Sequence, residues 1–175
     1  MPSHALTGLT DRLTDIDQLA RAHAAVGGSQ RGRRWDVQAL NRAQLVLLCA
    51  HFEGYLEDLM AEAIAAINGA LEPAALTRGF HNPWPDRIDQ LYAFLGMTSP
   101  ARTIAWRKAS NKTVRANLED MVRTRNKLAH GTTGVTVYKT DVDRYRRYVE
   151  GFSRRFDRAV RERVYSLTGR HPWPQ

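Results

Sequence analysis

An apolar stripe with alternating three- and four-residue steps runs through residues 140–167. This spacing matches the period of an α-helix and predicts a helix that begins near Thr140 or Asp141. The stripe consists of Val142, Tyr145, Val149, Phe152, Phe156, Val160, Val164 and Leu167. Arginines mixed with acidic residues fill the other face, which is typical of a solvated face with ion pairs between near neighbours. A helix this one-sided needs other helices to cover its apolar face.

Two further long helices are predicted in the first half of the chain. Residues 6–26 carry a single apolar stripe, whereas residues 36–68 carry an apolar surface too wide for a helix that faces solvent. Asp36 is a suitable N-cap for the second of these helices, and we expect that helix to be central. Shorter helices are predicted over residues 72–78 and from Asp86, as the cap, to Leu95.

A fourth principal helix is predicted from Asn111 or Thr113 up to Gly131, and only residues 135–138 read as an extended segment. The predicted fold class is therefore all-α, an up-and-down helical bundle of four principal helices plus one or two short helices. One domain is expected over residues 1–175, since no boundary or repeat interrupts the chain. Its parts are a core of about 36–167, an N-terminal helix 6–26, a flexible loop 27–34 and a loose tail 168–175.

The composition limits the cellular location that we expect for the protein and the role of its cysteine. No run of 18 or more apolar residues and no signal-like N-terminus are present, so no membrane span is expected and the protein is expected to be cytoplasmic. The single cysteine, Cys49, excludes an internal disulfide. Cys49 lies in an apolar helical segment and reads as a small core residue rather than a nucleophile.

The formal net charge of +8 and the pI of about 10.1 favour a polyanionic partner, nucleic acid first. The alternative is an arginine-rich surface that serves only solubility. Trp84, between two prolines, is expected to pack over the core, with stacking on a nucleobase as the alternative. The cationic candidates for RNA contact are Arg31, Arg33, Arg34, Arg107, Lys108, Lys112 and Arg123.

Residues 123–131, Arg-Thr-Arg-Asn-Lys-Leu-Ala-His-Gly, concentrate more chemistry than any other segment. Arg125 and Lys127 offer positive charge to an anion, and His130 brings a side chain of the type that titrates near neutral pH. Gly131 is suited to ending the helix. His, Cys and carboxylate residues at metal spacing, a phosphate-binding glycine loop and a Gly-x-Ser-x-Gly elbow are all missing from the sequence, so no metal or other cofactor is expected.

The spacing within this segment limits how it can act. Asn126 and His130 are four residues apart and share a helix face, whereas Arg125 and His130 are five apart and diverge by about 140° on a straight helix. Two arrangements could bring Arg125 and His130 to one phosphate. Either the helix loosens before His130, or a second copy of the chain completes the site across a two-fold axis.

Glu53 interrupts an apolar run of the central helix, and a buried carboxylate is costly unless it is paired. We favour Arg125 as its partner, the alternative being a surface position on a curved helix. A purely structural reading also exists for the motif. In that reading His130 only caps the C-terminus of the helix, where a cation is favoured. The ion pair of Arg125 with Glu53 then only stabilises the fold.

The Arg-x-x-x-x-His pattern of residues 125–130, with polar Asn126 directly after the arginine, resembles the signature of HEPN domains. Residues 43–57, which contain Phe52-Glu53-Gly54-Tyr55, resemble the core helix of the HEPN branch allied to the RiboL-PSP and MAE-type nucleases. The resemblance spans roughly Leu40 to Phe156.

This resemblance implies a metal-independent endoribonuclease that works as a homodimer with a composite active site. Arg125, His130 and Asn126 would be catalytic, with Glu53 and Lys127 supporting them. The implied products are a 2′,3′-cyclic phosphate and a 5′-OH. The family also suggests a toxin or defence effector restrained by an antitoxin or another regulatory protein. The alternative is a non-catalytic HEPN module that binds RNA or protein and dimerises.

Overall fold

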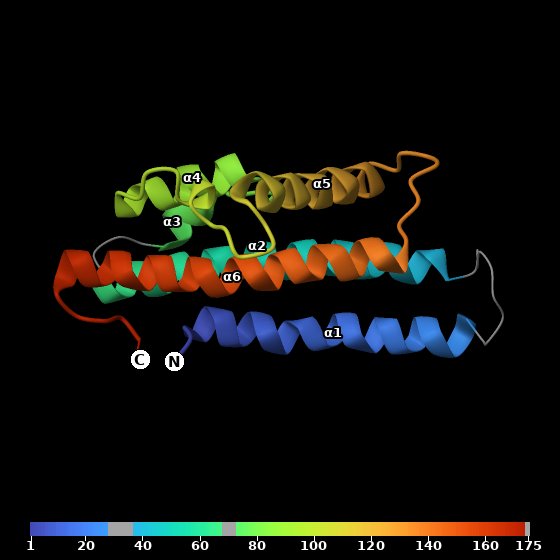
Figure 1. Ribbon diagram of the computed structural model, residues 1–175, viewed down its shortest axis with the longest axis horizontal. Helices are drawn as coiled ribbons and strands as arrows, with labels where there is room; N and C mark the ends of the chain where they lie inside the picture. The colour runs from blue at the N-terminus through green and yellow to red at the C-terminus, as the bar shows by residue number, and fades with distance from the viewer. Residues whose placement is uncertain (28–36, 68–72, 174–175) are drawn as a thin grey trace.

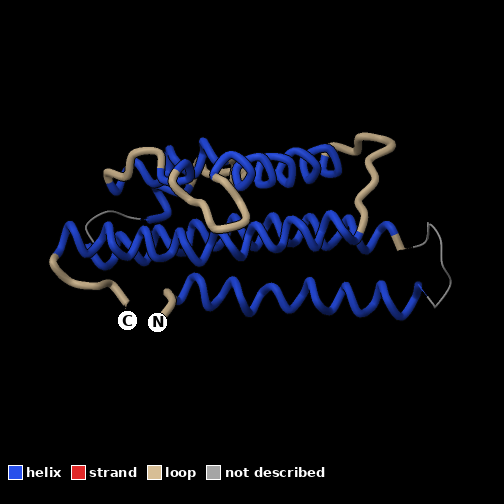
Figure 2. Tube along the Cα trace, viewed as in Figure 1, coloured by secondary structure: helices blue, strands red, loops and turns tan. Residues whose placement is uncertain are grey.

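The computed structural model describes residues 1–27, 37–67 and 73–173, and in these ranges it is built from helices without a strand (Figure 1). The α-helices are α1 (His4–Gly27), α2 (Gln38–Ile67), α3 (Pro73–Thr77), α4 (Pro85–Tyr92), α5 (Asn111–Ala129) and α6 (Lys139–Thr168). Two 3-10 turns follow α4, η1 (Ala93–Leu95) and η2 (Pro100–Arg102). Figure 2 shows the same trace as helices joined by loops. The predicted all-α bundle is confirmed.

The helices form three layers (Figure 1). α1 lies on one side, α2 and α6 lie together in the middle, and α5 with the short α3 and α4 lies on the other side. α2 packs against α1, α5 and α6. The expectation that this helix is central is therefore confirmed.

Aromatic residues fill the space between α2, α4 and α6. Phe152 packs edge-on against Phe52 at 5.7 Å and Phe156 packs edge-on against Tyr92 at 4.6 Å between ring centroids. Tyr92 is fully buried, and its hydroxyl donates to the carbonyl of Leu56 at 2.8 Å. Burying one such side chain contributes about 1.5–3 kcal/mol, so this cluster fixes how the three helices sit.

The connection between α5 and α6 is tied to the start of α2. The Asn41 amide donates to the carbonyl of Val137 at 3.1 Å, and Val137 itself is buried. Tyr138 has extended backbone angles, but within the described ranges residues 135–138 do not form a strand. α6 begins at Lys139, and the Asp141 carboxylate accepts the N–H of Tyr138 at 3.0 Å.

The start of α4 differs from the prediction. Asp86 is not the cap: Trp84 is the N-cap and Pro85 is the first helical residue. Proline suits this position because its missing N–H would have no partner inside the helix. Asp86 is in the first turn, where its carboxylate contacts Arg102 and Arg115.

Residues near both ends of the described chain contact α6, where Asp157 accepts a hydrogen bond from the Ser3 hydroxyl and Arg161 donates to Trp173. Trp173, within the tail that we expected to be loose, is only 5% exposed, and its carbonyl accepts a hydrogen bond from Arg161. Residues 28–34 of the expected flexible loop, and Asp36 as the expected cap of α2, lie outside the described residues.

Candidate active site at the end of α5

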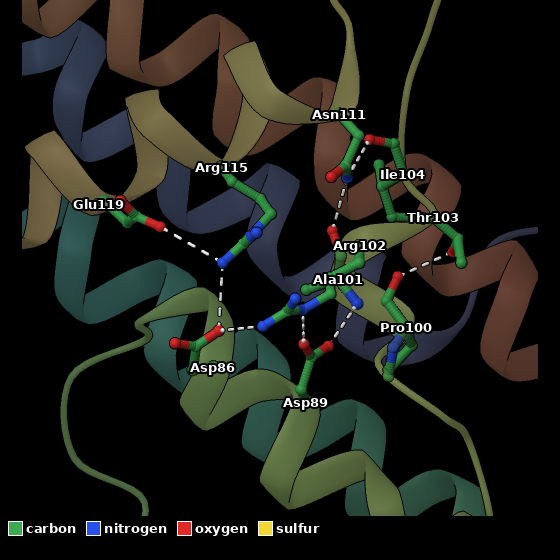
Figure 3. Close-up of polar contacts among 10 residues, drawn as sticks. All are labelled: Asp86, Asp89, Pro100, Ala101, Arg102, Thr103, Ile104, Asn111, Arg115 and Glu119. Carbon is green, nitrogen blue, oxygen red and sulfur yellow. Dashed lines mark hydrogen bonds and ion pairs between the residues drawn. The ribbon is translucent and has the colours of Figure 1, made fainter.

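A serine cap fixes the start of α5, and so do the contacts of the Asn111 side-chain amide, which Figure 3 shows. The Ser110 hydroxyl accepts the N–H of Thr113 at 3.2 Å, which satisfies one of the free donors of the first turn. The Asn111 amide donates to the carbonyls of Ala101 and Ile104 at 2.9 and 3.0 Å. α5 is therefore joined to the loop that precedes it.

Ion pairs join the same part of α5 to α4 and η2 (Figure 3). Arg115 lies 3.2 Å from Asp86 and 3.7 Å from Glu119, while Arg102 lies 3.4 Å from Asp86 and 3.6 Å from Asp89. Exposed pairs of this kind contribute little energy singly. Here two arginines meet at Asp86, so the network joins the first turns of α5 to α4 and η2.

At its far end, α5 closes in a Schellman motif. His130 is the C-cap, and its backbone N–H still donates to the carbonyl of Asn126 at 3.0 Å. Gly131 takes a φ of +67°, which lets the N–H of Thr132 reach back to the carbonyl of Lys127 at 2.9 Å. The helix is thus intact up to His130 and does not loosen before it, so the first arrangement that could join His130 to Arg125 is not observed.

The Arg125 guanidinium is half-buried and held at one end. Nη1 donates to the Asn82 side-chain oxygen at 2.8 Å and to that of the adjacent Asn126 at 3.1 Å. Nε is buried without a hydrogen-bond partner, and Nη2 donates no hydrogen bond to the residues that the structure describes. Nε and Nη2 form one edge of the planar guanidinium, the edge that can grip two oxygens of an anion at once.

The expected ion pair of Glu53 with Arg125 does not form. The Glu53 carboxylate instead accepts the backbone N–H of Asn82 at 3.2 Å, and Asn82 in turn contacts Arg125. Glu53 is therefore linked to Arg125 through Asn82, in the loop between α3 and α4. The predicted direct ion pair was wrong because the loop before α4 places Asn82 between Glu53 of α2 and Arg125 of α5.

Asn82 is the site residue that the sequence reading missed. Its φ is +63°, a region that asparagine tolerates better than most residues, and its carbonyl accepts the N–H of Trp84 at 2.8 Å. The buried prolines 83 and 85 anchor the loop on either side of Trp84. The Asn-Pro dipeptide indicated a turn, but nothing in it indicated contact with α5.

Cys49, one helical turn before Glu53, is a buried thiol near both charges. Burial raises the pKa of Cys49 to about 12, while Arg125 lowers it and Glu53 raises it further. A thiol in this state is not a nucleophile at neutral pH. The expectation that Cys49 is a core residue agrees with this geometry.

The exposed face of α5 carries Lys112 together with the remaining cations of the motif. Lys112, Arg123 and Lys127 are exposed, as is His130. On a helix Lys112 and His130 align after five turns, and Arg123 lies about 20° from them. Within the described part of the chain, none of these cations forms an ion pair. They form an open, mainly cationic row that ends at His130 and that also contains Glu119, seven residues after Lys112 and four before Arg123.

The model of the RiboL-PSP-HEPN family matches residues 72–162 of this chain, slightly more than half of it. The chain belongs to the RiboL-PSP-HEPN family. The match contains Asn82, Arg125 and His130 but not Glu53, so it begins later than the resemblance read from the sequence. Comparisons with curated proteins and with solved structures found no match.

The other RNA candidates of this HEPN domain separate into two groups. Arg107 and Lys108 are exposed in the loop before α5. Their neighbour Trp106 packs against Gly151 of α6, with the Arg155 guanidinium 4.7 Å from the centre of its ring, so the Trp106 ring is engaged in the fold. Arg31, Arg33 and Arg34 lie outside the described residues.

Among the described residues of the HEPN domain, no group of three His, Cys, Asp or Glu side chains is placed to hold a metal ion. Within the same ranges, no helix is both long enough and apolar enough to cross a membrane.

Proposed function

We propose that this HEPN domain is an endoribonuclease that needs no metal ion and cuts RNA through the attack of its own 2′-OH. The observation that carries the proposal is the state of Arg125. Two amide oxygens hold Nη1, while the Nε and Nη2 edge has no acceptor among the described residues. A phosphate oxygen that reaches Nη2 would meet a free donor next to the buried Nε, and lysine has no such planar pair of donors.

RNA supplies its own nucleophile, so the enzyme only has to move protons and stabilise charge on the phosphoryl oxygens. In the proposal His130 acts in proton transfer, which is typically worth about 10²- to 10⁴-fold in rate. Arg125 binds the phosphoryl oxygens, Asn126 keeps Arg125 oriented, and Lys127 adds positive potential. The products would be a 2′,3′-cyclic phosphate and a 5′-OH.

The intact helix favours a composite site. Because α5 stays helical up to His130, Arg125 and His130 of one protomer point about 140° apart. A two-fold symmetric dimer brings identical surfaces together, so that Arg125 could share a cleft with the partner's His130. The homodimer is therefore part of the proposal.

The same family membership supports a biological role, because HEPN domains are often nucleases. We propose that RNA is the substrate and that the protein acts as a toxin or defence effector in the cytoplasm, restrained by an antitoxin or regulatory protein.

Cleavage of a labelled RNA in EDTA tests the activity, with the same sequence as DNA for comparison. We expect wild-type protein to cut only the RNA and to leave a 2′,3′-cyclic phosphate, and we expect His130→Ala to be inactive. A requirement for added metal, or equal cutting of DNA, would contradict the mechanism. Tight RNA binding without any cutting would favour a non-catalytic binding module instead.

A further inference from the structure

A cavity of about 470 Å³ lies between the start of α4 and the exposed face of α5. It is lined by Trp84, Pro85, Asp86, Arg87, Gln90 and Glu119. It is open to solvent, and its volume falls within the range of small-molecule sites. None of these residues belongs to the Arg125–His130 motif.

Trp84 forms an aromatic wall of the cavity. Its side chain is half-buried and packs against the core while also lining the cavity. It is the N-cap of α4 and stands between buried prolines 83 and 85, so its backbone is held firmly. A tryptophan fixed in this way provides a surface on which a planar ring can stack.

The acidic residues of the cavity are largely neutralised. Arg115 bridges Asp86 and Glu119, and Arg102 contacts Asp86 from the other side (Figure 3). Arg87 adds a further positive charge to the lining. This balance disfavours both a free cation and a phosphate, and it suits an uncharged polar ring.

Hydrogen-bonding groups remain available around the cavity. The Gln90 side-chain oxygen accepts from Arg87 at 3.1 Å, which leaves its amide hydrogens free to donate. Glu119 lies 3.7 Å from Arg115, too far for a hydrogen bond, so its carboxylate can accept from a ligand. Carboxylates in this role accept from the exocyclic amino groups of bases.

The cavity lies beside the proposed active site along two paths. Trp84 follows two residues after Asn82, which contacts Arg125. Glu119 is one turn before Arg123 on the exposed face of α5 and about 16 Å from His130 along the helix axis. RNA that follows the cationic row would therefore pass the mouth of the cavity.

We infer that this cavity is a nucleobase subsite of the RNA substrate. A base stacks on Trp84, and Glu119 selects bases that carry an exocyclic amino group, which uracil lacks. This inference rests on the proposed function, because it assumes that RNA is bound along α5.

Equilibrium binding of short 2′-O-methyl oligonucleotides tests it without cleavage, using oligo-A, oligo-C and oligo-U with full-length protein. Wild type should bind oligo-A and oligo-C more tightly than oligo-U. Trp84→Ala should weaken binding by about fivefold or more, while Phe94→Ala, an exposed aromatic outside the cavity, should not. Glu119→Ala should reduce the preference for oligo-C over oligo-U by about fivefold, and Glu162→Ala, an exposed acid on α6, should leave it unchanged.

Thermal melts show whether each variant folds. If Trp84→Ala is unfolded, Trp84→Phe should keep most of the binding, and Glu119→Ala carries the test of selectivity. If wild type cuts RNA but Trp84→Ala binds it equally well, or Glu119→Ala keeps the full preference, the subsite is wrong and the proposed function stands. If wild type neither binds nor cuts RNA, both proposals fall.

Discussion

The side-chain oxygen of Asn82 lies 2.8 Å from Nη1 of Arg125, while the backbone N–H of Asn82 donates to Glu53 at 3.2 Å. One loop residue thus connects the central helix α2 to the proposed phosphate-binding arginine on α5. This contact leaves the Nε and Nη2 edge of Arg125 without a protein acceptor among the described residues.

Removing only the acceptor of Asn82 should misplace Arg125. Asn82→Gly tolerates the φ of +63° and keeps the N–H that contacts Glu53, so the loop should persist. A hydrogen bond to a charged group contributes about 1.5–3 kcal/mol, so we expect kcat on RNA to fall about tenfold or more. Asn82→Asp keeps an acceptor at this position and should keep most of the activity. Equal loss in both variants would point to a general defect of the loop.

Replacing Arg125 should abolish cleavage without unfolding the protein. Arg125→Lys keeps the charge but loses the two-donor edge, and Arg125→Ala loses both. Loss of one preorganised donor commonly costs about 10²- to 10³-fold in kcat, and we expect at least this for both variants. Size-exclusion chromatography should show the same oligomeric state for both variants as for wild type. A monomeric or unfolded Arg125→Ala protein would support a structural role for Arg125.

Mixed dimers test whether two protomers share one site. Arg125→Ala and His130→Ala proteins should each be inactive alone. After they are mixed and allowed to exchange subunits, a composite site predicts partial recovery of RNA cleavage, because some clefts then contain one intact Arg125 and one intact His130. No recovery, although mass spectrometry shows mixed dimers, would place the complete site within one protomer.

The glycine at the end of α5 should matter for stability. A Cβ at Gly131 would meet no atom within 4 Å, but the φ of +67° is unfavourable for alanine. We expect Gly131→Ala to reduce the free energy of unfolding by about 1 kcal/mol, measured by urea denaturation. Gly79→Ala is the matched control. A Cβ at Gly79 also meets nothing within 4 Å, and the φ of Gly79 lies outside the left-handed region. Equal effects in both variants would rule out backbone strain as the cause.

His51 lies on α2 beside Asp15 of α1, and its titration should make the free energy of unfolding depend on pH. Burial lowers the pKa of His51 below 6.5 and so does Arg12, whereas Asp15, 3.3 Å from Nε2, raises it. A depressed pKa means that protonation opposes folding, so this contribution is complete above about pH 6.5 and is lost as the pH falls through the folded pKa. Urea melts across this range should show a smaller slope for His51→Gln. Asp15→Asn removes the group that favours protonation and should make the slope steeper.

The helices could be predicted because their signal is local. The stripe from Val142 to Leu167 and the glycine at 131 act on neighbours within one or two turns, and helix formation depends on spacings of this length. The angle of about 140° between the directions of Arg125 and His130 could also be predicted, since it depends only on the helical repeat. The structure agrees with the sequence on each of these features apart from element ends, such as the start of α4 at Pro85 rather than Asp86.

The environment of Arg125 could be decided only by the tertiary structure. Asn82 is 43 residues from Arg125 and 29 residues from Glu53, so no periodicity links the three. Their meeting depends on how the loop before α4 is anchored by its buried prolines and how α4 and α5 are joined through Asp86 and Arg115. The sequence by itself determined the helices and the residue types at the end of α5. Packing of a loop between two helices determined which atoms of Arg125 are occupied and which remain for an anion, because such contacts depend on the whole core.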